Sequence, residues 1–175
     1  MDPANALCLA LDFPDAAAAV AWVRRTAGAF GTYKIGLQLF CAEGPRVVDA
    51  VRAAGAPRVF LDLKLHDIPH TVACALRALA PLGVGLVTVH VGGGRAMLEA
   101  AVEAVGEDGP RLLGVTALTS LDAEALREIG LAEAPVDLVR RRTRLAAEAG
   151  LHGVVCSPAE AAAARALLGA AGHVV

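Results

Sequence analysis

Charged side chains interrupt an apolar segment in the first half of the chain. The segment reads Val59-Phe60-Leu61-Asp62-Leu63-Lys64-Leu65-His66-Asp67-Ile68-Pro69, and its first residues are typical of a buried β-strand. Side chains two positions apart on a strand share a face and lie about 6.6 Å apart, so we expect Asp62 and Lys64 to point the same way. A flanking carboxylate favours the charged form of a partly buried lysine. The pattern therefore predicts a cation held ready for chemistry, although a strand-end ion pair at the surface would look the same.

A third charged residue, Asp67, follows this pair. It comes just before Ile68-Pro69, where the proline restricts the backbone and can open a helix. Asp67 is therefore expected beyond the strand end, where it can face a neighbouring molecule.

The elements that must position these residues alternate between short strands and Ala-rich helices. Runs rich in Val, Ile and Leu predict strands at 7–11, 33–37, 59–64, 86–90, 112–116 and 153–156, with a seventh beginning at 173–175. Segments of helical length predict helices at 15–27, 45–54, 69–80, 95–105, 122–129, 136–149 and 158–168. This alternation is the signature of βα units around a parallel sheet, in one domain covering residues 1–175.

The residues that could do chemistry share one position relative to these strands. Each lies in or shortly after a predicted strand, most of them toward its carboxyl end; they are Asp12, Lys34, Asp62, Lys64, His90, Thr119 and Ser120. A (β/α)8 barrel carries its active site at this end of its strands. An open doubly wound sheet also binds ligands there, but the first βα turn, 12–15, lacks a Gly-x-Gly-x-x-Gly fingerprint. The sequence therefore predicts an α/β fold, a (β/α)8 TIM-type barrel.

A glycine run, Gly92-Gly93-Gly94, follows the fourth predicted strand. Its backbone N–H groups could cradle a phosphate. A tight strand-to-helix turn is the favoured interpretation.

The composition excludes several classes of function. The 175 residues are 56% hydrophobic, which is enough to bury one core. A net charge of −2 and an aromatic content of 3% argue against a nucleic-acid surface. The basic cluster at 140–144 is interpreted as a solvated helix face with local charge pairs. Residues 1–5 lack a signal-peptide pattern and no apolar run has the length of a membrane span, so the expected location is the cytoplasm.

The four cysteines are widely spaced and form no Cys-x-x-Cys pair: Cys8, Cys41, Cys74 and Cys156. This spacing predicts neither a zinc site nor a disulfide framework. They are interpreted as small buried residues in a reducing compartment.

Short motifs follow one another along nearly the whole chain. They are LALDFP (9–14), YKIGLQLF (33–40), DLKLHDIP (62–69), VTVH (87–90) with GGRAML (93–98), GVTALTS (114–120) and GVVCS (153–157). Each is weak alone, except the Asp-x-Lys-x-x-Asp stretch, but their occurrence together in this order is highly specific. In these motifs the chain resembles the orotidine 5'-phosphate decarboxylase family.

The resemblance implies that orotidine 5'-monophosphate loses carbon dioxide from C6 to give uridine 5'-monophosphate, in de novo pyrimidine biosynthesis and with no metal or organic cofactor. Departure of the carboxylate leaves electron density on a ring carbon without a conventional electron sink. By the resemblance, Lys64 supplies positive charge and then a proton at that carbon, as preorganised charge and general acid. Asp62 keeps Lys64 protonated and positioned.

Other site residues are also implied by the resemblance. Asp67 reaches the site of the partner subunit in a homodimer, and Thr71 follows it toward the ribose. Asp12 and Lys34 bind the ribose and complete an alternating charge network.

Thr119, with Ser120 beside it, maps onto the residue that contacts the pyrimidine, although turn chemistry alone would also explain this pair. The histidines near the motifs match no catalytic position and are interpreted as structural; they are His66, His70 and His90.

The chain departs from the family in length. A closed barrel needs eight strands and about 200 or more residues, whereas six strands and the start of a seventh are predicted. The family's phosphate-binding arginine and glutamine come from the absent segment of two βα units. Either the sequence ends early relative to the natural protein, which we favour because an open edge of buried strands invites aggregation, or the chain is a truncated protein with a half-built site.

Two alternative functions remain open. A magnesium-dependent sugar-phosphate decarboxylase or aldolase of the same superfamily shares the Asp-x-Lys-x-x-Asp motif, but those relatives tend to carry a glutamate where this chain has Lys34. The other is a truncated, non-catalytic paralogue that dimerises through residues 67–71. A buried charge network without a task would be a stability liability, which argues against the second alternative.

Overall fold

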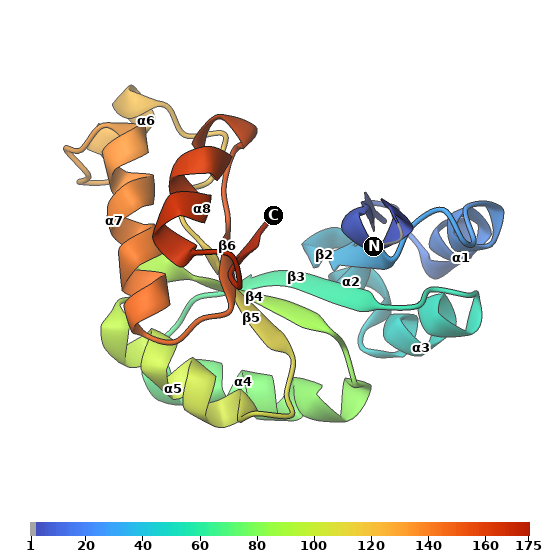
Figure 1. Cartoon of the computed structure of the whole chain (residues 1–175). Helices are drawn as coiled ribbons and strands as arrows, with labels where there is room; N and C mark the ends of the chain where they lie inside the picture. The colour runs from blue at the N-terminus through green and yellow to red at the C-terminus, as the bar shows by residue number, and fades with distance from the viewer. Residues whose placement is uncertain (1–2) are drawn as a thin grey trace. The chain divides into compact units, whose positions relative to one another are not determined.

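Parallel strands form the centre of the fold. A computed structural model describes residues 3–175, and these residues contain one seven-stranded sheet in the order β1-β2-β3-β4-β5-β6-β7 (Figure 1). The strands are β1 (Cys8–Ala10), β2 (Thr32–Gly36), β3 (Val59–Leu65), β4 (Leu86–His90), β5 (Arg111–Val115), β6 (Gly153–Val155) and β7 (His173–Val174).

Helices connect successive strands. They are α1 (Ala16–Arg25), α2 (Leu37–Glu43), α3 (Arg46–Ala53), α4 (Pro69–Leu79), α5 (Arg95–Val105), α6 (Ala123–Glu128), α7 (Pro135–Glu148) and α8 (Ala161–Leu168). Short 3-10 turns lie at η1 (Pro3–Ala6), η2 (Ala80–Leu82), η3 (Val91–Gly93) and η4 (Pro158–Glu160). A doubly wound sheet reverses its strand order, whereas this sheet keeps the order of the sequence, as a (β/α)8 barrel does. The predicted fold class is therefore confirmed.

The predicted elements are found within a few residues of their expected bounds, but one helix was not predicted. Leu37 was expected to end a strand, and it instead begins α2 after Gly36, which is extended at φ −88° and ψ 179°. The sequence Leu37-Gln38-Leu39 alternates in the manner of a strand. The segment is nevertheless helical, with Leu39 buried and Leu37 exposed.

The chain divides into two compact units, and the division falls within β3 and β4. The first unit comprises the chain up to Leu63 together with Leu79–Val87, and the second comprises Lys64–Ala78 together with Thr88–Val175.

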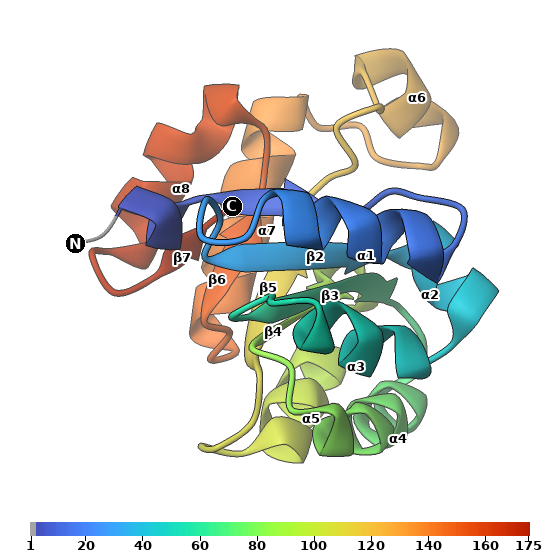
Figure 2. The same ribbon diagram turned by 90° about the vertical axis from the view of Figure 1, so that its right-hand side faces the viewer.

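The first unit aligns β1, β2 and β3 in register. Ala10 pairs with Lys34, Lys34 pairs with Phe60, and Gly36 pairs with Asp62. Asp15 is the N-cap of α1, and its carboxylate accepts the N–H of Ala18 at 2.8 Å. Helices α1 and α3 pack against each other (Figure 2). The core contains aliphatic side chains from the strands, these helices and the segment after β1, including Leu11, Val23, Ile35, Val48 and Leu61.

The second unit aligns β5, β6 and β7 and packs α7 against α8. Gly153 of β6 pairs with His173 of β7, and a Cβ at Gly153 would collide with the backbone of His173. Only glycine therefore permits this close approach. Asp122 is the N-cap of α6, and its carboxylate accepts the N–H groups of Glu124 and Ala125 at 2.9 Å each.

The glycine run takes the turn conformation that was favoured from the sequence. Gly92 and Gly93 lie in η3, and Gly94, at φ 81°, leads directly into α5. The positive φ of Gly94 is a conformation that L side chains rarely adopt.

The basic cluster behaves largely as predicted. Arg140 pairs with Asp137 and Arg141 with Glu133, both at the helix surface. Arg142 departs from this pattern, because its half-buried guanidinium donates to the carbonyl oxygen of Thr116.

The expected burial of the cysteines was wrong. Cys8, Cys41 and Cys74 are exposed and Cys156 is half-buried. Cys8 lies on β1, the first strand of the sheet order, and Cys41 and Cys74 lie on exposed helix faces. Among residues 3–175, no helix combines the length and apolar character needed to cross a membrane.

Candidate active site

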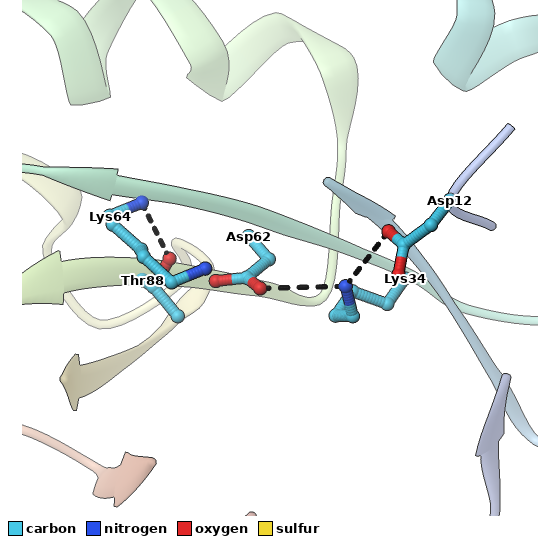
Figure 3. A network of polar contacts seen from close by, with 5 residues as sticks. All are labelled: Asp12, Lys34, Asp62, Lys64 and Thr88. Carbon is cyan, nitrogen blue, oxygen red and sulfur yellow. Dashed lines mark hydrogen bonds and ion pairs between the residues drawn. The ribbon is translucent and has the colours of Figure 1, made fainter. Parts of the chain in front are cut away.

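A lysine between two carboxylates forms the polar centre of the first unit. Lys34 Nζ lies 3.4 Å from Asp12 Oδ1 and 3.5 Å from Asp62 Oδ2 (Figure 3). The side chains of Lys34 and Asp62 are 21% and 13% exposed, whereas Asp12 is 62% exposed. The predicted grouping of these three residues is therefore present, with Asp62 as its most buried member.

The parallel register brings these residues together. The N–H of Leu11 donates to the carbonyl oxygen of Lys34 at 2.8 Å, which keeps the chain after β1 beside β2. Asp12, the next residue, therefore lies close to the Lys34 side chain. Asp62 arrives on the other side of β2, where it pairs with Gly36.

Gly36 makes room for this ion network, and sequence reasoning missed it. A Cβ at Gly36 would lie 3.0 Å from Asp12 Oδ1 and 3.6 Å from Lys34 Nζ. Its φ of −88° suits any residue, so space rather than backbone freedom favours glycine here. A glycine that opens a helix directly after a strand end was the available signal.

Lys64 follows Asp62 on the same strand and is the first residue of the second unit. Its φ is +49°, and within residues 3–175 it is the one non-glycine residue with a positive φ. Its backbone N–H donates to Thr88 Oγ1 at 2.8 Å (Figure 3). The side-chain alternation expected of a regular strand therefore does not apply at Lys64.

Asp67 and Thr71 lie on the surface of the second unit. Asp67 follows β3, and its carboxylate accepts the N–H of Ile68 at 2.6 Å. Thr71 lies in the first turn of α4. Both residues are exposed, as a contact with a second subunit would require, but that contact remains a prediction.

Thr119 and Ser120 lie in the loop between β5 and α6, and both are exposed. The N–H of Leu121 donates to the carbonyl oxygen of Leu118 at 3.0 Å, so the pair occupies a hydrogen-bonded turn. The turn explanation thus has direct support, and the predicted contact with a pyrimidine stays a prediction.

His90, the last residue of β4, packs face to face with His66, which follows β3. Their ring centroids are 4.9 Å apart at an interplanar angle of 11°, and the N–H of Gly92 donates to His90 Nδ1 at 3.1 Å. Burial lowers the pKa of His90 to about 4, with further lowering by His66, Arg142 and Lys64. His90 is therefore neutral at pH 7 and accepts a hydrogen bond that orders the turn, which agrees with a structural role.

The third histidine, His70, lies on α4 with its Nε2 atom 3.5 Å from Cys74 Sγ. Over the part of the chain that the structure describes, no group of three or more His, Cys, Asp or Glu residues is arranged to hold a metal ion.

Comparison with known proteins identifies close relatives. Residues 5–173 match the family described as "Orotidine 5'-phosphate decarboxylase / HUMPS family". A protein of Anaeromyxobacter sp. (strain K) named orotidine 5'-phosphate decarboxylase is 53% identical over 169 residues, which cover 97% of this chain and 74% of the relative.

Two solved structures share the fold. One is described as an uncharacterized conserved protein from Geobacillus kaustophilus; it has a TM-score of 0.88 and 42% identity, with 95% of this chain and 80% of that chain covered. The other is orotidine 5'-phosphate decarboxylase from Lactobacillus acidophilus, with a TM-score of 0.84 and 32% identity, covering 95% and 77% of the two chains.

Proposed function

The chain belongs to the orotidine 5'-phosphate decarboxylase / HUMPS family, and from this membership we propose that it converts orotidine 5'-monophosphate to uridine 5'-monophosphate and carbon dioxide, without a cofactor, in pyrimidine biosynthesis. The enzyme is then a carbon–carbon lyase. The observation that carries the proposal is the Asp12–Lys34–Asp62 ion network, which is followed on β3 by Lys64.

Lys64 performs the chemical step in this proposal. The bond between C6 and the carboxylate carbon breaks, carbon dioxide leaves, and the electron pair stays on C6. The Lys64 ammonium stabilises this developing charge and then transfers a proton from Nζ to C6, and the neutral amine regains a proton from solvent. Preorganised positive charge is effective here because the site supplies it without reorganisation.

Asp62 and Lys34 keep the charges ordered. The Lys34 ammonium, 3.5 Å from Asp62, restrains a carboxylate that is largely removed from water. Asp62 precedes Lys64 by two residues on β3, and the proposal assigns it the positioning of the Lys64 ammonium.

Further residues are assigned to substrate binding and to the neighbouring subunit. In the proposal Asp12 and Lys34 bind the ribose, and Thr119 and Ser120 contact the pyrimidine. Asp67 is a catalytic residue of the neighbouring site in a cytoplasmic homodimer, and Thr71 reaches that site toward the ribose. The exposure of these last four residues supports their contact with another molecule.

Lys34 also favours this function over the magnesium-dependent alternative. A metal that holds an enediolate needs carboxylate ligands, whereas here the Lys34 ammonium pairs with both carboxylates beside it. A non-catalytic paralogue is disfavoured because it would keep this partly buried network without a use for it.

The test is the ultraviolet absorbance change of orotidine 5'-monophosphate with the native-length protein. We expect turnover that a chelator does not alter, complete loss in Lys64→Ala, and full activity in Arg46→Ala, which removes an exposed cation of α3. Substantial turnover by Lys64→Ala would overturn the role of Lys64. Turnover only of a β-keto sugar-acid phosphate with Mg²⁺ would overturn the proposed reaction in favour of the alternative, and a folded protein inactive on both substrates would indicate the non-catalytic paralogue.

A further inference from the structure

The backbone of Lys64 is held in a conformation that lysine rarely adopts. At φ +49° it lies in the left-handed region, where the Cβ of an L-residue crowds the backbone. Lysine lacks the short polar side chain that lets Asn or Asp tolerate this region by hydrogen bonding locally. Such strain persists only where the surrounding structure imposes it, so some neighbour of Lys64 must do so.

Thr88 is the neighbour that the geometry identifies. Its side-chain hydroxyl oxygen, Oγ1, accepts a hydrogen bond from the backbone N–H of Lys64 at 2.8 Å (Figure 3). Thr88 lies within β4 and is fully buried. A threonine on a strand is also restricted about χ1, which fixes where its oxygen lies.

Losing this acceptor would remove the restraint on Lys64. A buried or half-buried N–H without a partner is costly, so the backbone would rotate to find another acceptor. The ammonium stands at the end of four methylene groups, and a backbone rotation at Cα therefore displaces it. Displacements of about 1 Å can cost about a hundredfold in rate when a reacting group must be aligned.

We propose that Thr88 is a positioning residue, whose hydroxyl holds the left-handed backbone of Lys64 and thereby aims its ammonium. This inference rests on the proposed function only in assigning the chemical step to Lys64. Thr88 itself touches no reacting atom.

Three variants separate positioning from a merely structural role. Thr88→Val keeps the shape but removes the acceptor, and Thr88→Ser keeps the hydroxyl. Thr143→Val is the matched control, because Thr143 is equally buried in the second unit and its hydroxyl donates to the Val139 carbonyl at 2.8 Å.

We expect Thr88→Val to lower kcat by about 10- to 100-fold with KM within about twofold of the wild-type value. Thr88→Ser should restore kcat to within about threefold, and Thr143→Val should leave kcat unchanged. Thr88→Val with wild-type kcat, or Thr143→Val with an equal loss, would overturn the proposal.

Hydrogen exchange of the Lys64 amide tests the restraint without relying on activity or on the folding of Thr88→Val. In the unaltered protein and in Thr88→Ser this amide should exchange far more slowly than amides of the loop after β5. Exchange as fast as in that loop would overturn the proposal even in an active enzyme. Absence of turnover together with a protected Lys64 amide would instead contradict the proposed function and leave the restraint by Thr88 standing.

Discussion

The two carboxylates beside Lys34 should contribute very differently to stability although their distances are nearly equal. Nζ lies 3.4 Å from Asp12 and 3.5 Å from Asp62, but Asp12 is 62% exposed and Asp62 only 13%. At an effective dielectric constant of about 20, a pair at the longer distance attracts by about 4.7 kcal/mol; at about 80, a pair at the shorter distance attracts by about 1.2 kcal/mol. Burial rather than distance therefore decides which pair is stronger.

Desolvation and side-chain ordering reduce both values. We expect a net coupling of about 1–2 kcal/mol for Lys34 with Asp62 and less than about 0.5 kcal/mol for Lys34 with Asp12. The assay is two double-mutant cycles in urea unfolding, built from Lys34→Met, Asp62→Asn, Asp12→Asn and the two double variants. Raising the salt concentration to about 1 M should remove most of the Asp12 coupling and less of the Asp62 coupling. Equal couplings, or a larger one for Asp12, would refute the reasoning.

Three further predictions concern Gly36, His90 and Asp15. Gly36→Ala should change the free energy of unfolding by less than about 1 kcal/mol, because the exposed Asp12 can rotate away from the added methyl group. The same variant should raise KM for the nucleotide, and an unchanged KM would contradict the role of Gly36. Burial lowers the pKa of His90 from 6.5 to about 4, so its contribution to stability is complete above about pH 6.5 and is lost as the pH falls toward 4. The free energy of urea unfolding should differ less between pH 7 and pH 4.5 in His90→Asn than in the wild type. An equal pH dependence in the two proteins would contradict this role of His90. Asp15→Ala should destabilise the protein by about 1 kcal/mol in thermal or urea unfolding, through loss of the α1 N-cap, with kcat unchanged; a lower kcat would be unexpected.

Local sequence patterns predicted the positions of the strands and of helix starts without reference to tertiary contacts. Runs of Val, Ile and Leu located the strands, because a strand buried on both faces reads as a continuous apolar segment. The helices predicted at 15–27 and 122–129 each begin with an aspartate, whose carboxylate accepts N–H groups that the first turn leaves unpaired. The spacing of Asp62 and Lys64 drew attention to β3, the strand that carries Asp62 of the ion network.

The tertiary structure decided how distant residues meet and which of them are buried. The proximity of Asp12, Lys34 and Asp62 depends on the parallel register of three strands, and Gly36 matters only because of the space around it. Likewise, the left-handed backbone of Lys64 accompanies a hydrogen bond to a residue 24 positions away, Thr88. Periodicity and propensity report on neighbours in sequence, whereas these contacts join separate strands, and only the folded register specifies them.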